Sequence, residues 1–81
     1  MHEAYILLNC ERGSEGPLMK TLSEFDGVKE LRGVFGEYDI LVKLELPLAE
    51  MLNETVRTKI RNLKKISGSL ILLTNEGQTV I

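Results

Sequence analysis

The residues best suited to chemistry form a four-residue turn, Gly36-Glu37-Tyr38-Asp39, which leads directly into an alternating apolar segment. A glycine turn frees backbone N–H groups, and a neighbouring carboxylate can bind an ammonium group. Asp39 and those N–H groups could therefore bind a zwitterion such as a free amino acid. The alternative is purely structural, because glycine and aspartate also satisfy the backbone of an ordinary turn and tyrosine can cover the edge of a core.

The sequence offers little for catalysis or metal binding. His2 is the only histidine and Cys10 the only cysteine, so neither a histidine-dependent nucleophile nor a cysteine-rich zinc site is expected. Glu37 and Asp39 form a carboxylate pair, but no further residue supplies a partner for acid–base catalysis. We expect a non-enzymatic protein with no catalytic residues, no metal and no cofactor.

Composition restricts the classes of partner. The chain has 81 residues and a formal net charge of −2, with the two signs interspersed. Direct nucleic-acid binding is not expected, because it needs a basic face.

No apolar run is long enough to span a membrane and no signal peptide is present, so we expect a cytoplasmic protein. A core this small is marginal, and without disulfides oligomerisation is the simplest source of further buried area.

Four cationic residues cluster after the second apolar stripe: Lys59, Arg61, Lys64 and Lys65. Cations suit the C-terminus of a helix because the helix dipole is negative there. We interpret the cluster as a solvated helix end, and a phosphate-binding patch is the alternative.

Apolar periodicity predicts the elements that position the turn. Residues 4–10 form a nearly continuous apolar run, which is typical of a strand buried on both faces. Residues 14–27 have helical spacing, with Pro17 in the first turn and Gly27 after the last. Residues 28–35 predict a more polar edge strand and residues 39–46 an alternating strand. The short turn between these two makes them an antiparallel hairpin.

The second half of the sequence predicts one further helix and one further strand. After Pro47, a helix is predicted by one apolar stripe, which comprises Leu48, Leu52, Val56, Ile60 and Leu63. Residues 69–74 predict a final strand, and the sequence does not decide the structure of residues 75–81. Right-handed connections place both helices on one face of an antiparallel four-stranded sheet. The sequence predicts an α+β, ferredoxin-like βαββαβ sandwich as one domain over residues 1–81.

The predicted fold leaves the other sheet face uncovered. Strands that are apolar on both sides place leucine and isoleucine there, and such a patch is usually an interface. We therefore expect a homodimer that packs these open faces together. An RNA-recognition motif would need aromatic residues on that face, where Leu41, Lys43 and Glu45 stand instead. A dimeric α+β barrel enzyme, an isomerase or a monooxygenase, is a further alternative.

The chain resembles the effector-binding domain of the Lrp/AsnC transcriptional regulators, also called the RAM domain. The likeness covers residues 4–74, and its most specific part is Gly36-x-Tyr38-Asp39 in a βαββαβ setting. The other matching parts are residues 4–9 with Gly13, the junction Phe25-Asp26-Gly27-Val28, Ile60-x-x-Leu63, and the entry to the last strand.

The resemblance implies a dimer that assembles further into a ring, with a free amino acid bound between dimers. The effector site would combine residues from two subunits: Gly36, Glu37, Tyr38 and Asp39 from one, and Ser67 and Ser69 from its neighbour. Binding would shift the assembly between states for which the ligand has different affinities. The 81 residues contain no helix-turn-helix, so we expect a stand-alone RAM protein that acts on full-length Lrp/AsnC-type regulators. A ferredoxin-like assembly module without a ligand is the alternative.

The chain departs from the family pattern at two places. Lys65-Ile66 stands where the family often has a glycine before a valine. Ser69 matches the first of two threonines spaced by one residue in the last strand, and Ile71 replaces the second. If the second hydroxyl contacts the effector, ligand affinity or preference differs here.

Overall fold

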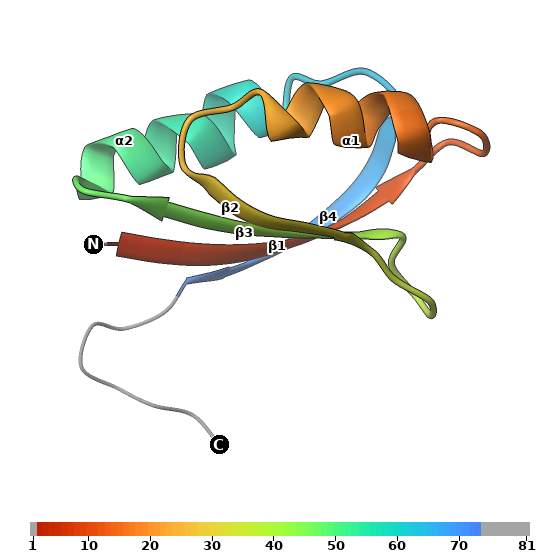
Figure 1. The fold of residues 1–81 in the computed structure, drawn as a ribbon, viewed down its shortest axis with the longest axis horizontal. Coiled ribbons are helices and arrows are strands. Elements are labelled where there is room, and N and C mark those ends of the chain that lie inside the picture. The colour runs from red at the N-terminus through yellow and green to blue at the C-terminus, as the bar shows by residue number, and fades with distance from the viewer. Residues whose placement is uncertain (1, 74–81) are drawn as a thin grey trace.

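The computed structural model describes residues 2–73. In chain order they form β1 (His2–Cys10), α1 (Glu15–Ser23), β2 (Val28–Gly33), β3 (Ile40–Leu46), α2 (Ala49–Glu54), the π-helix η1 (Thr55–Ile60) and β4 (Ile66–Leu73). The strands make one antiparallel sheet in the order β2-β3-β1-β4. The helices cover one face of this sheet (Figure 1). The predicted ferredoxin-like α+β fold is confirmed, and the predicted tail, residues 75–81, lies outside the described residues.

The core lies between the sheet and the helices. Strand β3 alternates strictly, because its even-numbered residues from Ile40 to Leu46 are buried and its odd-numbered residues are half-buried. Strand β1 follows the same rule, with Ala4, Ile6 and Leu8 fully buried. The helices contribute the other half of the core through Leu18, Leu22, Leu52, Val56 and Ile60. Within residues 2–73, no helix is long and apolar enough to cross a membrane.

Two strand boundaries differ from the prediction. β2 ends at Gly33 and not at Phe35, because the Val34 N–H donates to the Asp39 carbonyl (2.9 Å) and closes the loop just after the last paired residues. Phe35 is therefore fully exposed in the loop. β4 begins at Ile66 and not at Ser69, since its pairing with β1 continues across a register shift to Cys10.

The second helix is not a single α-helix. Of the predicted stripe, Leu52 lies in α2, and Val56 and Ile60 lie in the π-helical η1. Leu48 is exposed just before α2, and Leu63 follows η1. Apolar residues spaced by four drift around an α-helix of about 3.6 residues per turn. The wider i→i+5 turn of η1 lets Val56 and Ile60 stay on the buried side.

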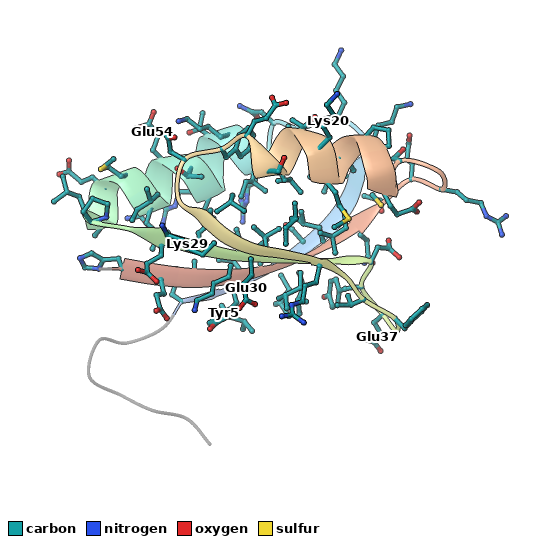
Figure 2. All side chains as sticks on the ribbon, viewed as in Figure 1. Tyr5, Lys20, Lys29, Glu30, Glu37 and Glu54 are labelled. Atoms are coloured by element: carbon teal, nitrogen blue, oxygen red, sulfur yellow. The ribbon has the colours of Figure 1, made fainter. Side chains whose placement is uncertain are left out.

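The sheet face opposite the helices is the open face, as predicted. Cross-strand pairing places Leu7 between Leu41 and Leu70, and the next position places Tyr5 beside Leu72. In Figure 2, Tyr5 projects from the sheet on the side away from the helices. Charged side chains accompany this apolar strip: Lys43 lies 5.8 Å from the Tyr5 ring centre, and Arg32 lies 3.6 Å from Glu30.

Lys43 remains a cation on the open face. The Tyr5 phenol, followed by the Glu3 carboxylate, raises the pKa of the Lys43 ammonium above its ordinary value. The open face therefore combines an apolar strip with a fixed positive charge.

Candidate functional site

The glycine turn predicted to bind the effector is a loop that projects from one end of the sheet (Figure 1). Gly36 has φ +121°, in the region that favours glycine, and a Cβ added there would meet nothing within 4 Å. Backbone conformation, and not lack of space, therefore requires this glycine. Glu37 is exposed, whereas Tyr38 is half-buried.

Asp39 has a structural role, which sequence analysis gave as the alternative, but its partner lies in β1 and not within the turn. One of its carboxylate oxygens, Oδ2, accepts a hydrogen bond from the Cys10 backbone N–H at 3.0 Å. Its own N–H donates to the Leu8 carbonyl at 2.9 Å. The pairing of β1 with β4 shifts register between Asn9 and Cys10, so the carboxylate satisfies an N–H where the ladder is irregular. Asp39 thereby connects the turn to the end of β1.

The two serines predicted to complete the effector site lie in a groove at the start of β4. Its volume is about 300 Å³, and its lining residues are Leu8, Ile60, Arg61, Ile66, Ser67, Gly68 and Ser69. Ser67 and Ser69 are exposed, as is Arg61. The groove lies between the C-terminal end of η1 and β4, the sheet's edge strand. It offers two hydroxyls and one guanidinium to a ligand.

Arg61 is the member of this groove that sequence analysis missed. The cationic cluster containing it was interpreted as a solvated helix end. Arg61 directly follows η1 and has no ion-pair partner among the described residues. Its proximity to Ser67 and Ser69 depends on the reversal of the chain after η1, which composition does not reveal. A guanidinium beside two hydroxyls is suited to a carboxylate.

The turn and the groove flank the same end of β1. Leu8 pairs with Ile40 of β3 on one side and with Ser69 of β4 on the other. Within residues 2–73, the turn and the two serines make no hydrogen bond to one another. The contribution of the serines from a neighbouring subunit stays a prediction.

The two departures from the Lrp/AsnC sequence pattern, at Lys65-Ile66 and at Ile71, each have a defined local structure. Lys65 has φ +76°, a conformation that favours glycine, and is held by Glu11 through both backbone and side chain. The Glu11 N–H donates to the Lys65 carbonyl at 2.8 Å, and the Lys65 ammonium lies 3.2 Å from the Glu11 carboxylate. Ile71 packs against the core, opposite Ile6, so an apolar contact occupies the position of the second hydroxyl.

The Cys10 thiol lies beside two carboxylates. Burial raises the pKa of the Cys10 thiol, and the nearby carboxylates of Glu15 and Asp39 raise it further. The sulfur lies 3.7 Å from Glu15 Oε1 and 3.8 Å from Asp39 Oδ2. The described part of the chain holds no group of three or more histidine, cysteine, aspartate or glutamate residues that could bind a metal ion.

Comparison with known proteins finds two small proteins that this chain covers almost completely. No family model matches it. The crystal structure of FFRP-DM1 is 32% identical, with a TM-score of 0.88 over 93% of this chain and 100% of FFRP-DM1. A hypothetical protein from Pyrococcus horikoshii is also 32% identical, with a TM-score of 0.86 over 93% of this chain and 90% of its own.

Two longer proteins contain a similar segment. Escherichia coli AsnC is 19% identical, with a TM-score of 0.80 over 99% of this chain and 56% of AsnC, which shows a shared fold. Homocitrate synthase of Sulfurisphaera tokodaii is 38% identical over 72 residues, which are 88% of this chain and 15% of the enzyme. The chain thus spans about half of AsnC and a small part of the synthase. It belongs to the family of small FFRP-type proteins that includes FFRP-DM1, and it has the Lrp/AsnC fold.

Proposed function

We propose that this chain is an amino-acid-responsive regulatory and oligomerisation domain of Lrp/AsnC type, which binds a free amino acid between copies of itself. The observation that carries the proposal is the state of the Asp39 carboxylate. Oδ2 is fixed by the Cys10 N–H at 3.0 Å, and no hydrogen bond to Oδ1 is found among residues 2–73. The carboxylate is therefore oriented by the fold and keeps an oxygen for the ammonium group of a ligand.

The other end of the ligand would bind in the groove of a neighbouring copy. There Arg61 would pair with the ligand carboxylate, and Ser67 and Ser69 would donate hydrogen bonds to it. The groove volume of about 300 Å³ lies at the lower end of the range for small-molecule pockets, about 300–1,000 Å³. Ile66 supplies an apolar wall for a side chain. A small or medium-sized amino acid fits these dimensions.

The open face supports assembly. Its apolar strip contains Tyr5, Leu7, Leu41, Leu70 and Leu72, and the last two are 41% and 50% exposed. We propose that a second copy covers this strip and that the resulting dimers associate further through the ends that carry the glycine turn. A ring of dimers is the closed form of such an association.

The greater length of AsnC suggests the kind of regulatory partner. This chain matches 56% of AsnC, so a full-length regulator of that fold carries further residues that this chain does not match. A mixed assembly of this domain with such a regulator in the cytoplasm would bring amino-acid control to a DNA-bound protein. Co-purification with mass measurement by light scattering tests this, and exclusively homomeric particles would contradict it.

A second candidate partner is an enzyme. A segment 38% identical to this chain occurs within a homocitrate synthase. The same kind of domain can therefore be covalently joined to a catalytic protein, and this chain could control an enzyme as a separate subunit. Co-purification that recovers a synthase in place of a DNA-binding regulator would favour this candidate.

Calorimetric titration with the twenty amino acids tests the ligand proposal. Asp39→Asn is the informative variant, because the amide oxygen can still accept the Cys10 N–H while the negative charge is lost. We expect binding to weaken by about 10- to 150-fold, the value of a charge-assisted hydrogen bond. Asp26→Asn is the matched control, since Asp26 is exposed at the junction of α1 and β2.

The outcomes separate the alternatives. If no amino acid produces heat with the wild-type protein, the chain is an assembly module without a ligand. If Asp39→Asn and Asp26→Asn bind equally well, the site is wrongly assigned. Turnover of a small molecule inside the sheet-to-sheet dimer would instead support a dimeric α+β barrel enzyme, an isomerase or a monooxygenase.

A further inference from the structure

Phe35 is an aromatic side chain that does not pack into the core of its own fold. It is fully exposed in the loop between β2 and β3, next to Gly36. The loop is held in shape at its base, because the Val34 N–H donates to the Asp39 carbonyl at 2.9 Å. A large aromatic group on a fixed projection is a typical anchor of a protein interface.

An apolar pocket that is suited to an aromatic side chain lies on the helix side of the molecule. It is formed by the start of α1 and the segment between η1 and β4, and its volume is about 330 Å³. Its lining residues are Gly13, Ser14, Pro17, Leu18, Thr21, Leu63, Lys64 and Lys65. Pro17, Leu18 and Leu63 give it an apolar floor into which a benzyl group can insert.

The charges beside the two features are complementary. Glu37 is exposed two residues after Phe35 and lies at the tip of the projecting loop (Figure 2). Lys64 is exposed at the pocket and has no ion-pair partner among the described residues, whereas Lys65 is paired with Glu11 at 3.2 Å. An inserted Phe35 would therefore bring Glu37 toward the unpaired ammonium of Lys64.

The pocket cannot be filled by the loop of the same chain. The loop extends from the sheet away from the helices (Figure 1). The pocket is lined by the start of α1 and by the segment between η1 and β4, on the helix side. We infer that Phe35 of one copy inserts into the pocket beside Pro17 and Leu63 of a second copy, with Glu37 pairing with Lys64. Both features lie at the same end of the sheet, so two copies can exchange loops reciprocally and close the contact.

This contact deepens the proposed function and rests on it for the position of the ligand. The pocket includes Lys64 and Lys65, and the effector groove begins at Ile66 in the same segment. Docking Phe35 would therefore carry the turn toward the neighbour's Ser67. The end-to-end contact is a second interface, distinct from the open face of the sheet.

The contact is tested by sedimentation equilibrium without any amino acid, so that the result does not depend on ligand binding. The wild-type protein should form particles larger than a dimer. Phe35→Ser should reduce the association constant of this step at least about 30-fold, as for an interface hot spot. Leu48→Ser is the matched control, because Leu48 is also an exposed apolar residue, 58% exposed, at the start of α2. It should leave the assembly unchanged.

A charge exchange tests the pairing itself. Glu37→Lys and Lys64→Glu should each weaken association about 2- to 5-fold, and the double variant should restore it. A photoreactive benzoylphenylalanine at position 35 should crosslink to peptides that contain Pro17 or Leu63.

Three results would overturn the inference: a wild-type protein that never exceeds a dimer, a Phe35→Ser variant that assembles like the wild type, or crosslinks confined to other surfaces. Intact assembly without amino-acid binding would refute the proposed ligand and leave this interface standing.

Discussion

Gly27 links the end of α1 to β2 at a place where a side chain has no room. Its φ is +91°, and its carbonyl accepts a hydrogen bond from the Glu45 N–H at 2.8 Å. A Cβ added at Gly27 would lie 2.7 Å from both Cγ and Cδ2 of Leu46 and 3.1 Å from the Glu45 carbonyl oxygen. Leu46 is buried in the core, so it cannot move away freely. Gly27→Ala therefore combines backbone strain with overpacking.

The free energy of unfolding should fall by about 2–4 kcal/mol in Gly27→Ala. A left-handed backbone costs an L-residue about 1–2 kcal/mol, and forcing extra volume into a packed core costs about 1–3 kcal/mol. Alanine also restricts the unfolded chain, which offsets about 0.4–1 kcal/mol. For a domain of this size the loss corresponds to a decrease in Tm of about 8–32 °C.

Urea unfolding followed by circular dichroism measures this change at one fixed protein concentration, because association adds to apparent stability. Gly16→Ala is the matched control: Gly16 lies in α1, and a Cβ there would meet nothing within 4 Å. The control should be neutral or stabilised by up to about 1 kcal/mol. If Gly27→Ala loses less than about 1 kcal/mol, the junction is looser than these contacts imply and the reasoning fails.

Three further predictions concern the end of the sheet that carries the turn. Asp39→Ala should lower the free energy of unfolding by about 1–2 kcal/mol more than Asp39→Asn, because only alanine leaves the Cys10 N–H without its acceptor; equal urea midpoints would contradict this. Lys65→Gly should be more stable than Lys65→Ala by about 1 kcal/mol, since both lose the Glu11 ion pair and only glycine tolerates φ +76° without strain; the reverse order would exclude that strain. Iodoacetamide labelling of Cys10 should rise with a pH midpoint above that of an ordinary thiol, because burial and the carboxylates of Glu15 and Asp39 raise the pKa of this group. Glu15→Gln should shift that midpoint downward. A raised pKa in the folded state also means that this group's contribution to stability is fully present below the ordinary pKa of a thiol, about 8.5, and is lost as the pH rises through the raised pKa of the folded state. A labelling midpoint unchanged by Glu15→Gln would show that the carboxylate does not act on the thiol.

The fold was predictable because the sequence patterns that specify it are local and periodic. The alternation from Ile40 to Leu46 specifies which face of β3 is buried, and the order of elements then leaves one packing solution. Gly27 and Gly36 were predicted as turn residues, and both have positive φ. Such signals depend on the identity of one residue and its immediate neighbours.

The parts of the site that escaped prediction depend on contacts between distant residues. Asp39 bonds the N–H of Cys10, 29 positions earlier, at a register shift that no periodicity marks. Arg61 reaches the serine groove because the chain reverses between η1 and β4. Phe35 was assigned to β2 because it continues the alternation of Leu31 and Gly33, but the hydrogen bond from Val34 to Asp39 ends the strand earlier. In each case tertiary geometry decides the role of a residue whose type was known.

Asp39 has two roles under the proposed function: it accepts the Cys10 N–H, and it binds the ammonium group of the ligand. These two roles couple ligand binding to the assembly of subunits. If the turn supplies the ammonium contact and a neighbour supplies Arg61, Ser67 and Ser69, then an isolated dimer offers only half of the site. The ligand would bind the assembled form more tightly by the value of the neighbour's contacts, about 1.5–3 kcal/mol for a charged hydrogen bond, or about 10- to 150-fold. Linkage is reciprocal, so saturating ligand must raise the association constant by the same factor. A ligand that binds tightly and leaves the association constant unchanged must therefore be held by one subunit alone, which would exclude a shared site.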